Sequence, residues 1–128
     1  MKKYLLITIL FIQSSFSQEL DLLNDIQKKI YENHDVQVRA EYPKSGKGFN
    51  TFVKENLEKE SIEILKNEIS VSFIVEIDGV ISNVEITDDI NENLKEKIKN
   101  VLKKSPKWVP AEHEGYRVKV KIKVKLQF

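Results

Sequence analysis

The sequence predicts an α+β fold of two layers, in which helices pack on one face of a three-stranded antiparallel sheet. Three observations indicate this class. Apolar residues recur every three or four positions in three segments, as in amphipathic helices. The runs 69–77 and 116–128 instead alternate apolar and polar residues, as in strands with one buried face. Between the first of these runs and a shorter third one, Asp78-Gly79 predicts a tight hairpin.

The first 17 residues have the layout of a secretory signal peptide. Two lysines precede an apolar run from Tyr4 to Ile12, and small polar residues follow it. The run is about half of the roughly 20 residues that a membrane-spanning helix needs. We therefore expect residues 1–17 to be removed before Gln18 and the rest of the chain to be periplasmic. An uncleaved inner-membrane anchor that faces the periplasm is the competing interpretation.

Residues 18–39 are predicted to form an N-terminal helical segment, and residues 40–128 the main domain. In the segment, a helix is expected over residues 19–33. Its apolar side chains recur at helical spacing and share one stripe: Leu20, Leu23, Ile26 and Ile30. The cluster of proline and glycine over residues 42–48 then predicts a turn, because Pro43 ends regular structure.

Two further helices frame the hairpin of the main domain. The first is expected over residues 47–57, with Phe49, Phe52, Val53 and Leu57 on one face. The second is expected to follow the hairpin, with Asp88 or Asp89 as its cap and its end marked by Pro106. Its apolar stripe is Ile90, Leu94, Ile98, Val101 and Leu102.

The two strand-like parts of this domain are the hairpin and the last segment of the chain. The returning strand of the hairpin, residues 80–87, carries Ile81, Val84 and Ile86. The final strand, residues 116–128, places two kinds of side chain on opposite faces. One face has Val118, Val120, Ile122, Val124 and Leu126, and the other has Lys119, Lys121, Lys123 and Lys125.

Residues 40–128 resemble the TonB C-terminal domain, especially the form found in Bacteroidota. The most specific stretch is a helix followed by Pro-Lys-Trp-x-Pro, a turn with glycine and an alternating terminal strand. Here these are Pro106, Lys107, Trp108, Pro110, Gly115 and Phe128. The segments AEYPKSGKGFNTFVKENL and VSFIVEIDGVISNVEI are similar to the family's preceding helix and first hairpin, although Pro43-Lys44-Ser45-Gly46 replaces the family's Pro-Gly-Gly turn.

The resemblance implies a noncatalytic domain that binds extended segments of outer-membrane transporters, or of other envelope proteins, by strand addition. Full members of the family also carry a membrane anchor and a long proline-rich spacer, with which they transduce energy. This chain has three prolines, and none precedes Pro43. The binding role is therefore the expectation, and a membrane-anchored energy transducer is the alternative.

Strand addition would use the final strand, if that strand borders the sheet and leaves main-chain N–H and C=O groups free. The predicted partner-binding residues are Trp108, Tyr116, Val118, Val120, Ile122 and Val124. Trp108 is either an exposed anchor for the partner or a core residue that closes the space between the last helix and the last strand. The same strand edge could instead pair with a second copy and form a homodimer.

The lysine row of the final strand is interpreted as a solvated face, since Glu76 and Glu85 on the hairpin could lie opposite. Contact with an acidic or phosphate-rich surface is the alternative. The whole chain has 21 basic and 20 acidic residues, so no general attraction to nucleic acid follows. Nucleic acid is not an expected partner.

The residues do not predict catalysis, a metal site or a cofactor. The chain has no cysteine, which excludes disulfides and thiol chemistry. His34 and His113 are its two histidines, and His113 stands between two glutamates that cannot converge on one metal with it. The acidic and amide residues from Asp88 to Asn93 lack the central glycine and final glutamate of a calcium loop.

Overall fold

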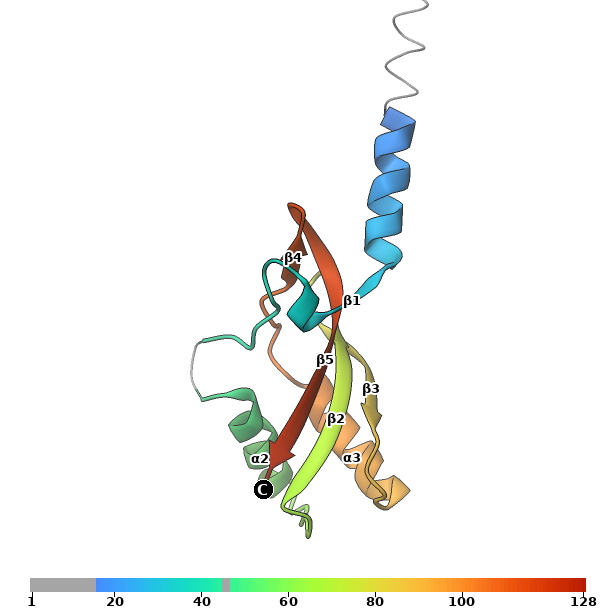
Figure 1. Cartoon of the computed structure of the whole chain (residues 1–128). Helices are drawn as coiled ribbons and strands as arrows, with labels where there is room; N and C mark the ends of the chain where they lie inside the picture. The colour runs from blue at the N-terminus through green and yellow to red at the C-terminus, as the bar shows by residue number, and fades with distance from the viewer. Residues whose placement is uncertain (1–15, 45–46) are drawn as a thin grey trace, which may run out of the picture.

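The computed structural model describes residues 16–44 and 47–128, and these fold into three α-helices and five strands (Figure 1). The helices are a first one over residues 16–28, α2 (Phe49–Lys59) and α3 (Glu92–Lys103), with a short 3-10 turn η1 (Asn33–Asp35). The strands are β1 (Ile30–Glu32), β2 (Glu68–Val75), β3 (Ile81–Ile86), β4 (Ala111–His113) and β5 (Tyr116–Gln127).

The strands form one mixed sheet in the order β1-β5-β2-β3, and β4 pairs with the start of β5. The α+β class is confirmed, but the prediction of a three-stranded antiparallel sheet is wrong. β1 was missed because Ile30 continues the helical spacing of the residues before it. It runs parallel to β5, with Ile30 beside Lys119 and Glu32 beside Lys121. β4 has only three residues, too few for an alternating pattern.

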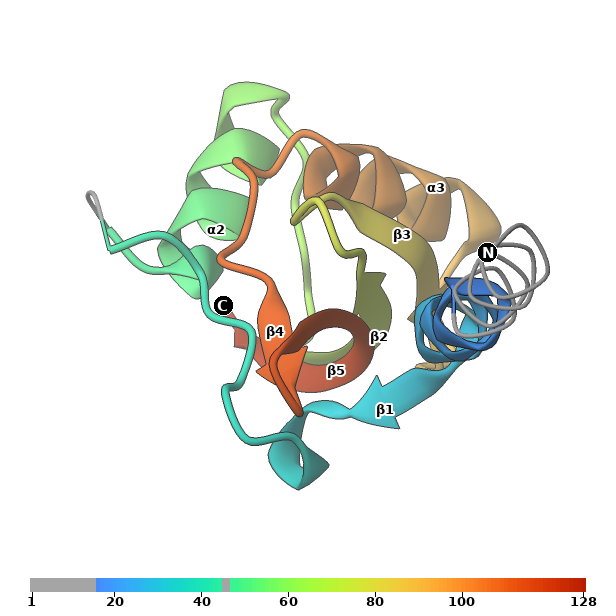
Figure 2. The ribbon, with the colours of Figure 1, turned by 90° about the horizontal axis from the view of Figure 1, so that it is seen from above.

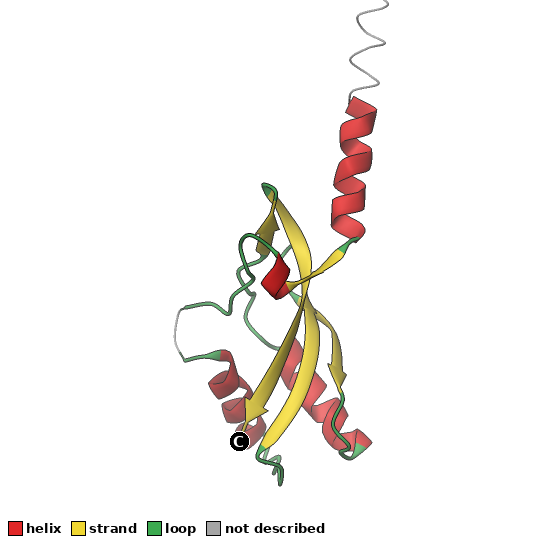
Figure 3. Ribbon diagram, in the orientation of Figure 1, coloured by secondary structure: helices red, strands yellow, loops and turns green. Residues whose placement is uncertain are grey.

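Helices α2 and α3 cover the same face of the sheet, and the core lies between them and the strands (Figures 1, 2 and 3). The helices contribute Val53, Leu57, Ile98, Val101 and Leu102, none of them more than 2% exposed. Facing them are the inward side chains of the three long strands: Ile69, Val71, Phe73, Val75, Ile81, Val84, Ile86, Val118, Val120, Ile122 and Leu126. These apolar faces agree with the predicted periodicities.

The first helix projects away from this body (Figure 1). It ends at residue 28, where residues 19–33 had been predicted as helix, because Ile30–Glu32 add to the sheet as β1. Leu20 and Leu22 are about half exposed, and Ile26 is partly packed against the core. Within residues 16–44 and 47–128, no helix is both long and apolar enough to cross a membrane. Residues 1–15 of the predicted signal peptide lie outside the described residues, so its cleavage stays a prediction.

The hairpin between β2 and β3 has a different turn from the predicted one. Both central residues were expected at positive φ, but of the two only Gly79 is there, with φ 86°. Its N–H donates to Glu76, and the Glu76 N–H donates to Val80, which gives a three-residue loop with glycine in the left-handed position. Asn83, at φ 50°, then forms a β-bulge. The bulge explains the three-residue step from Ile81 to Val84, because it keeps both side chains in the core.

The start of α3 also differs from the expectation. Its cap is Asn91, whose side chain accepts a hydrogen bond from the N–H of Asn93 at 2.7 Å. Asp88 instead accepts the main-chain N–H of Ser70 at 2.6 Å, on the side of β2 that faces β3. The carboxylate thus accepts the hydrogen bond from a β2 main-chain N–H that a carbonyl of β3 would have accepted if β3 continued.

Candidate functional site

Strand β5 has its two edges in different environments. Along one edge, residues 120–127 pair with β2 in an unbroken antiparallel register. The N–H of Phe128 donates to the carbonyl of Asn67 in line with that pairing. Successive residues of a strand direct their main-chain groups to opposite edges, so every second residue before Phe128 shares its direction. Leu126 and Val124 therefore direct their N–H and C=O groups to β2. Lys123, Lys125 and Gln127 direct theirs to the opposite edge.

The opposite edge is occupied at both ends and open between them. At one end, β1 pairs with residues 119–121. At the other end, the side-chain amide of Asn50 makes the two hydrogen bonds that a neighbouring strand would make to Gln127. Its Oδ1 accepts the N–H of Gln127 at 2.6 Å, and its Nδ2 donates to the Gln127 carbonyl at 3.0 Å. Residues 122–126 have no neighbouring strand on this side among the described residues. We call this stretch the open edge.

A hollow of about 260 Å³ adjoins the open edge where β1 ends. It is lined by residues of β5, by the last residue of β1 and by the segment that follows β1: Glu32, Asn33, His34, Arg39, Lys121, Ile122 and Lys123. The side chain of Asn33 holds that segment in place, because it accepts the N–H of Ala40 at 2.8 Å and donates to its carbonyl. The start of the open edge is therefore exposed to solvent rather than covered by the chain.

The solvent-facing lysines of β5 are partly paired. Lys119 lies 3.5 Å from Glu76, and Lys125 lies 3.5 Å from Glu68. The predicted approach of Glu76 to the lysine row is confirmed. Glu85 makes no ion pair within the described chain, and neither Lys121 nor Lys123 has a carboxylate within 4.0 Å there. A second hollow, of about 500 Å³, lies over this face, with Ser70, Ser72 and Thr87 beside the lysines.

Trp108 lies in the core and is 7% exposed. Its ring centroid is 5.1 to 5.6 Å from those of Phe49, Phe73 and Tyr42, with the rings close to perpendicular. Its Nε1 donates to the hydroxyl of Ser105 at 3.2 Å. Of the two interpretations of Trp108, the structure supports the core residue. The same surroundings raise the pKa of Tyr42 by desolvation.

The other predicted binding residues lie along β5 with different exposures. Val118, Val120 and Ile122 face the core and are at most 7% exposed. Their main-chain groups are directed to β4 and β2, so none of the three offers a hydrogen bond to a partner at the open edge. Residues 120 and 121 have strands on both sides, β1 and β2, so the prediction that β5 borders the sheet is wrong there. Tyr116 is exposed but pairs with His113 of β4. Val124 is partly buried and belongs to the open edge.

Sequence reasoning missed Asn50 and Glu32, which bound the open edge. Asn50 lies in the first turn of α2, where asparagine is common for local reasons, and its partner Gln127 is 77 residues away. Glu32 appeared to be part of a helix. Both contacts are long-range, so no local pattern in the sequence could indicate them.

In the described part of the chain, each of the two histidines lies near one carboxylate. His34 lies 3.3 Å from Asp35, and His113 lies 4.0 Å from Glu114, each a neighbour in sequence. Nowhere in residues 16–44 and 47–128 do three His, Asp or Glu side chains gather closely enough to hold a metal ion. The arrangement at β5 thus offers main-chain hydrogen bonds and lysine charges.

Comparison of the chain with known protein families, with curated proteins and with solved structures gives no match.

Proposed function

We propose that the chain is a noncatalytic periplasmic binding domain of the TonB C-terminal type, which binds an extended segment of another envelope protein by strand addition. A segment of an outer-membrane transporter is the partner that the resemblance of residues 40–128 implies. The observation that supports the binding mode is the open edge of β5. The main-chain groups of Lys123 and Lys125 there face outward without a neighbouring strand in the described chain.

The open edge has the size of a short strand site. Its five residues, 122–126, span roughly 17 Å at the usual rise of a strand. It offers four main-chain groups, the N–H and C=O of Lys123 and of Lys125. An extended peptide that pairs with these groups would lie in line with β1 and continue the sheet on that side.

The proposal narrows the binding region from residues 116–127 to residues 122–126. On this edge β1 already occupies residues 119–121, and Asn50 occupies Gln127. Trp108 supports the fold rather than the contact, because its ring is enclosed by other aromatic side chains. Exposed Tyr116 lies at the far end of β5 from the open edge.

Synthetic extended peptides from the periplasmic segments of outer-membrane transporters provide the test. The full chain, labelled with ¹⁵N, is titrated with each peptide, and amide shifts are followed. We expect the largest shifts at Lys123 and Lys125 and slower amide hydrogen exchange at both. Shifts confined to other elements, or no shift with any peptide, would contradict strand addition at this edge.

Lys123→Pro supplies a variant that blocks the site through the main chain. Proline removes the outward N–H and leaves the pairing of β5 with β2 intact, as prolines in edge strands do. Lys123→Ala is the matched control, because it removes the side chain and keeps the N–H. Peptide binding should be lost in the proline variant and persist in the alanine variant. Equal binding by both would exclude main-chain pairing at this residue.

Pairing of the open edge with a second copy is the competing use of the same groups. An isologous contact along residues 122–126 would bring Lys123 and Lys125 of two copies side by side, and like charges across a strand pair are destabilising. A different partner therefore fits this edge better. Sedimentation of the free chain checks this: a stable dimer that Lys123→Pro dissociates would favour self-association.

A further inference from the structure

We propose that the open edge selects partner segments with acidic side chains at alternate positions, so that every second residue of the bound strand meets a lysine of β5. This inference rests on the proposed function and specifies the chemistry of its partner. Side chains of neighbouring strands stand beside one another on the same face at about 5 Å. A strand added at residues 122–126 would therefore place half of its side chains beside Lys121, Lys123 and Lys125.

Strand β1 shows what a strand on this side of β5 looks like. Tyr31 is the register partner of Val120, is partly packed against the core and has its ring 5.1 Å from that of His113. Glu32 is the register partner of Lys121, so it lies on the face of the sheet that carries the solvent-facing lysines of β5. β1 thus has Tyr31 inward and two outward residues beside lysines: half-exposed Ile30, the register partner of Lys119, and, next to the open edge, the acidic Glu32. A partner that continues the line of β1 meets the same two faces.

The charges along the open edge favour the same pattern. Lys121 and Lys123 have no carboxylate within 4.0 Å in the described part of the chain, and Arg39 lines the hollow at the start of the edge with them. Glu32 is the one acidic residue in that lining. An acidic side chain added here gains cationic neighbours without displacing an ion pair that Lys121 or Lys123 already makes.

The opposite face of the added strand favours apolar side chains. Val124 is partly buried, and it lies between the exposed residues Lys123 and Lys125, where no strand neighbours β5 on this side among the described residues. A residue of the partner beside Val124 would cover it as Tyr31 covers Val120. The predicted motif is therefore acidic–apolar–acidic over three successive residues. Its alternation distinguishes it from a polyanion, which would bind the lysines but not the main chain.

Three blocked heptapeptides test the motif: Thr-Glu-Val-Glu-Val-Glu-Thr, the same peptide with each Glu replaced by Gln, and the same with each Glu replaced by Lys. Binding to the full chain is measured by amide shifts at low salt. We expect the Glu peptide to bind roughly tenfold more tightly than the Gln peptide, the sum of a few exposed pairs, and the Lys peptide most weakly. The advantage of the Glu peptide should shrink at high ionic strength.

Two variants locate the effect. In the double variant Lys121→Gln, Lys123→Gln, the Glu and Gln peptides should bind within about threefold of each other, whereas Lys97→Gln on α3, an exposed lysine elsewhere, should keep the difference. Equal affinity of the Glu and Gln peptides for the native chain, with shifts still at Lys123 and Lys125, overturns the inference and leaves strand addition standing. Failure of all three peptides and of the transporter-derived peptides overturns both.

Discussion

Trp108 and residues of the final strand were predicted together as partner-binding residues, with a core position as the other interpretation of Trp108, and the structure gives Trp108 and the open edge different surroundings. Trp108 is enclosed by Tyr42, Phe49 and Phe73, and its main-chain N–H donates to Gly79 at 2.9 Å. The open edge, residues 122–126, has solvated lysines and main-chain groups without a neighbouring strand. The first region is therefore expected to contribute mainly to stability, and the second is the proposed binding site.

The two regions are nevertheless connected through α2. Phe49 of α2 packs on Trp108, and the next residue, Asn50, holds the main chain of Gln127 at the end of the open edge. The aromatic cluster thus positions the side chain that limits the length of the site. Variants that affect one region and leave the other unchanged can test how far this separation extends.

Trp108→Ala should have the largest effect on stability. Removing a buried indole leaves a cavity among three aromatic rings, and such truncations cost about 3–5 kcal/mol. Chemical unfolding monitored by circular dichroism measures the loss. The control is Tyr116→Ala, which removes an exposed ring and should change the free energy of unfolding by less than about 0.5 kcal/mol.

Peptide binding by Trp108→Ala, measured where the variant is folded, sharpens the comparison. We expect a dissociation constant within about threefold of the native value, since the ring of Trp108 packs on Tyr42, Phe49 and Phe73 inside the core and not on the outward main-chain groups of Lys123 and Lys125. A much weaker binding by folded protein would show that the two regions act as one surface.

Gly79→Ala should be the next most destabilising change. Gly79 has φ 86°, a region that costs an L-residue about 1–2 kcal/mol, and an added Cβ would overlap the carbonyl oxygen of Trp108. The overlap is with main chain, so we expect a total loss of about 3 kcal/mol in unfolding experiments. Gly115→Ala is the matched control, because it has a similar φ of 83° with open space around it. An equal loss in both variants would assign the effect to backbone strain alone.

A proline scan of β5 compares its two edges directly. Val124→Pro removes an N–H directed to β2 and leaves a carbonyl of that strand unpaired, which should cost about 2–3 kcal/mol. Lys123→Pro removes an N–H directed to the open edge and should cost under about 1 kcal/mol. Thermal or chemical unfolding distinguishes the two. Comparable losses would mean that the edge at Lys123 is already paired.

The alternation along β5 was predictable from the sequence, because valine or isoleucine and lysine alternate over residues 118–125. That pattern established which side chains are buried, and the buried faces of α2, α3 and β2 were predictable for the same reason. It carries no information about which strands lie beside β5. Neighbours are chosen by long-range pairing, so the placement of β5 between β1 and β2 could not be read from it.

The limits of the open edge depend on residues whose local signals point elsewhere. In the sequence, Asn50 has the position of an ordinary residue in the first turn of a helix. Ile30 has the spacing of the last apolar residue of a helical stripe. Trp108 was open to two interpretations because an indole beside two prolines fits either a core or an exposed anchor. The positions of Phe49 and Phe73 around it decide the matter, and both depend on the tertiary fold.

Asn50→Ala should have a moderate effect on stability and a specific effect on the open edge. The variant loses both hydrogen bonds to Gln127, which are exposed, so we expect a cost of about 1 kcal/mol in chemical unfolding. The site gains the two main-chain groups of Gln127. Hydrogen exchange at the Gln127 amide should become faster in the free variant, and longer extended peptides should bind more tightly. Asn100→Ala, an exposed asparagine of α3, is the control.

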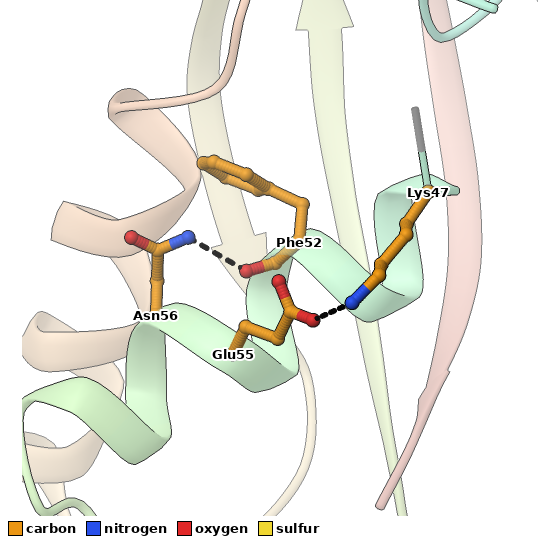
Figure 4. A network of polar contacts seen from close by, with 4 residues as sticks. All are labelled: Lys47, Phe52, Glu55 and Asn56. Carbon is orange, nitrogen blue, oxygen red and sulfur yellow. Dashed lines mark hydrogen bonds and ion pairs between the residues drawn. The ribbon is translucent and has the colours of Figure 1, made fainter. Parts of the chain in front are cut away.

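The smallest effect is expected where α2 meets solvent, at the ion pair of Lys47 and Glu55 (Figure 4). The two side chains are 2.7 Å apart and exposed, and their hydrogen bond lowers the pKa of Glu55 and raises the pKa of Lys47. Because the pKa of Glu55 is lower in the folded state, its contribution is present above the unfolded-state pKa and is lost as the pH falls through the folded-state pKa. Solvent screens the pair, so Glu55→Gln should leave the thermal midpoint at pH 7 unchanged within error. Carboxyl shifts followed by NMR should show the pKa of Glu55 rising in Lys47→Ala. A clear drop of the midpoint in Glu55→Gln would mean that this surface of α2 contributes to holding Asn50 at the open edge.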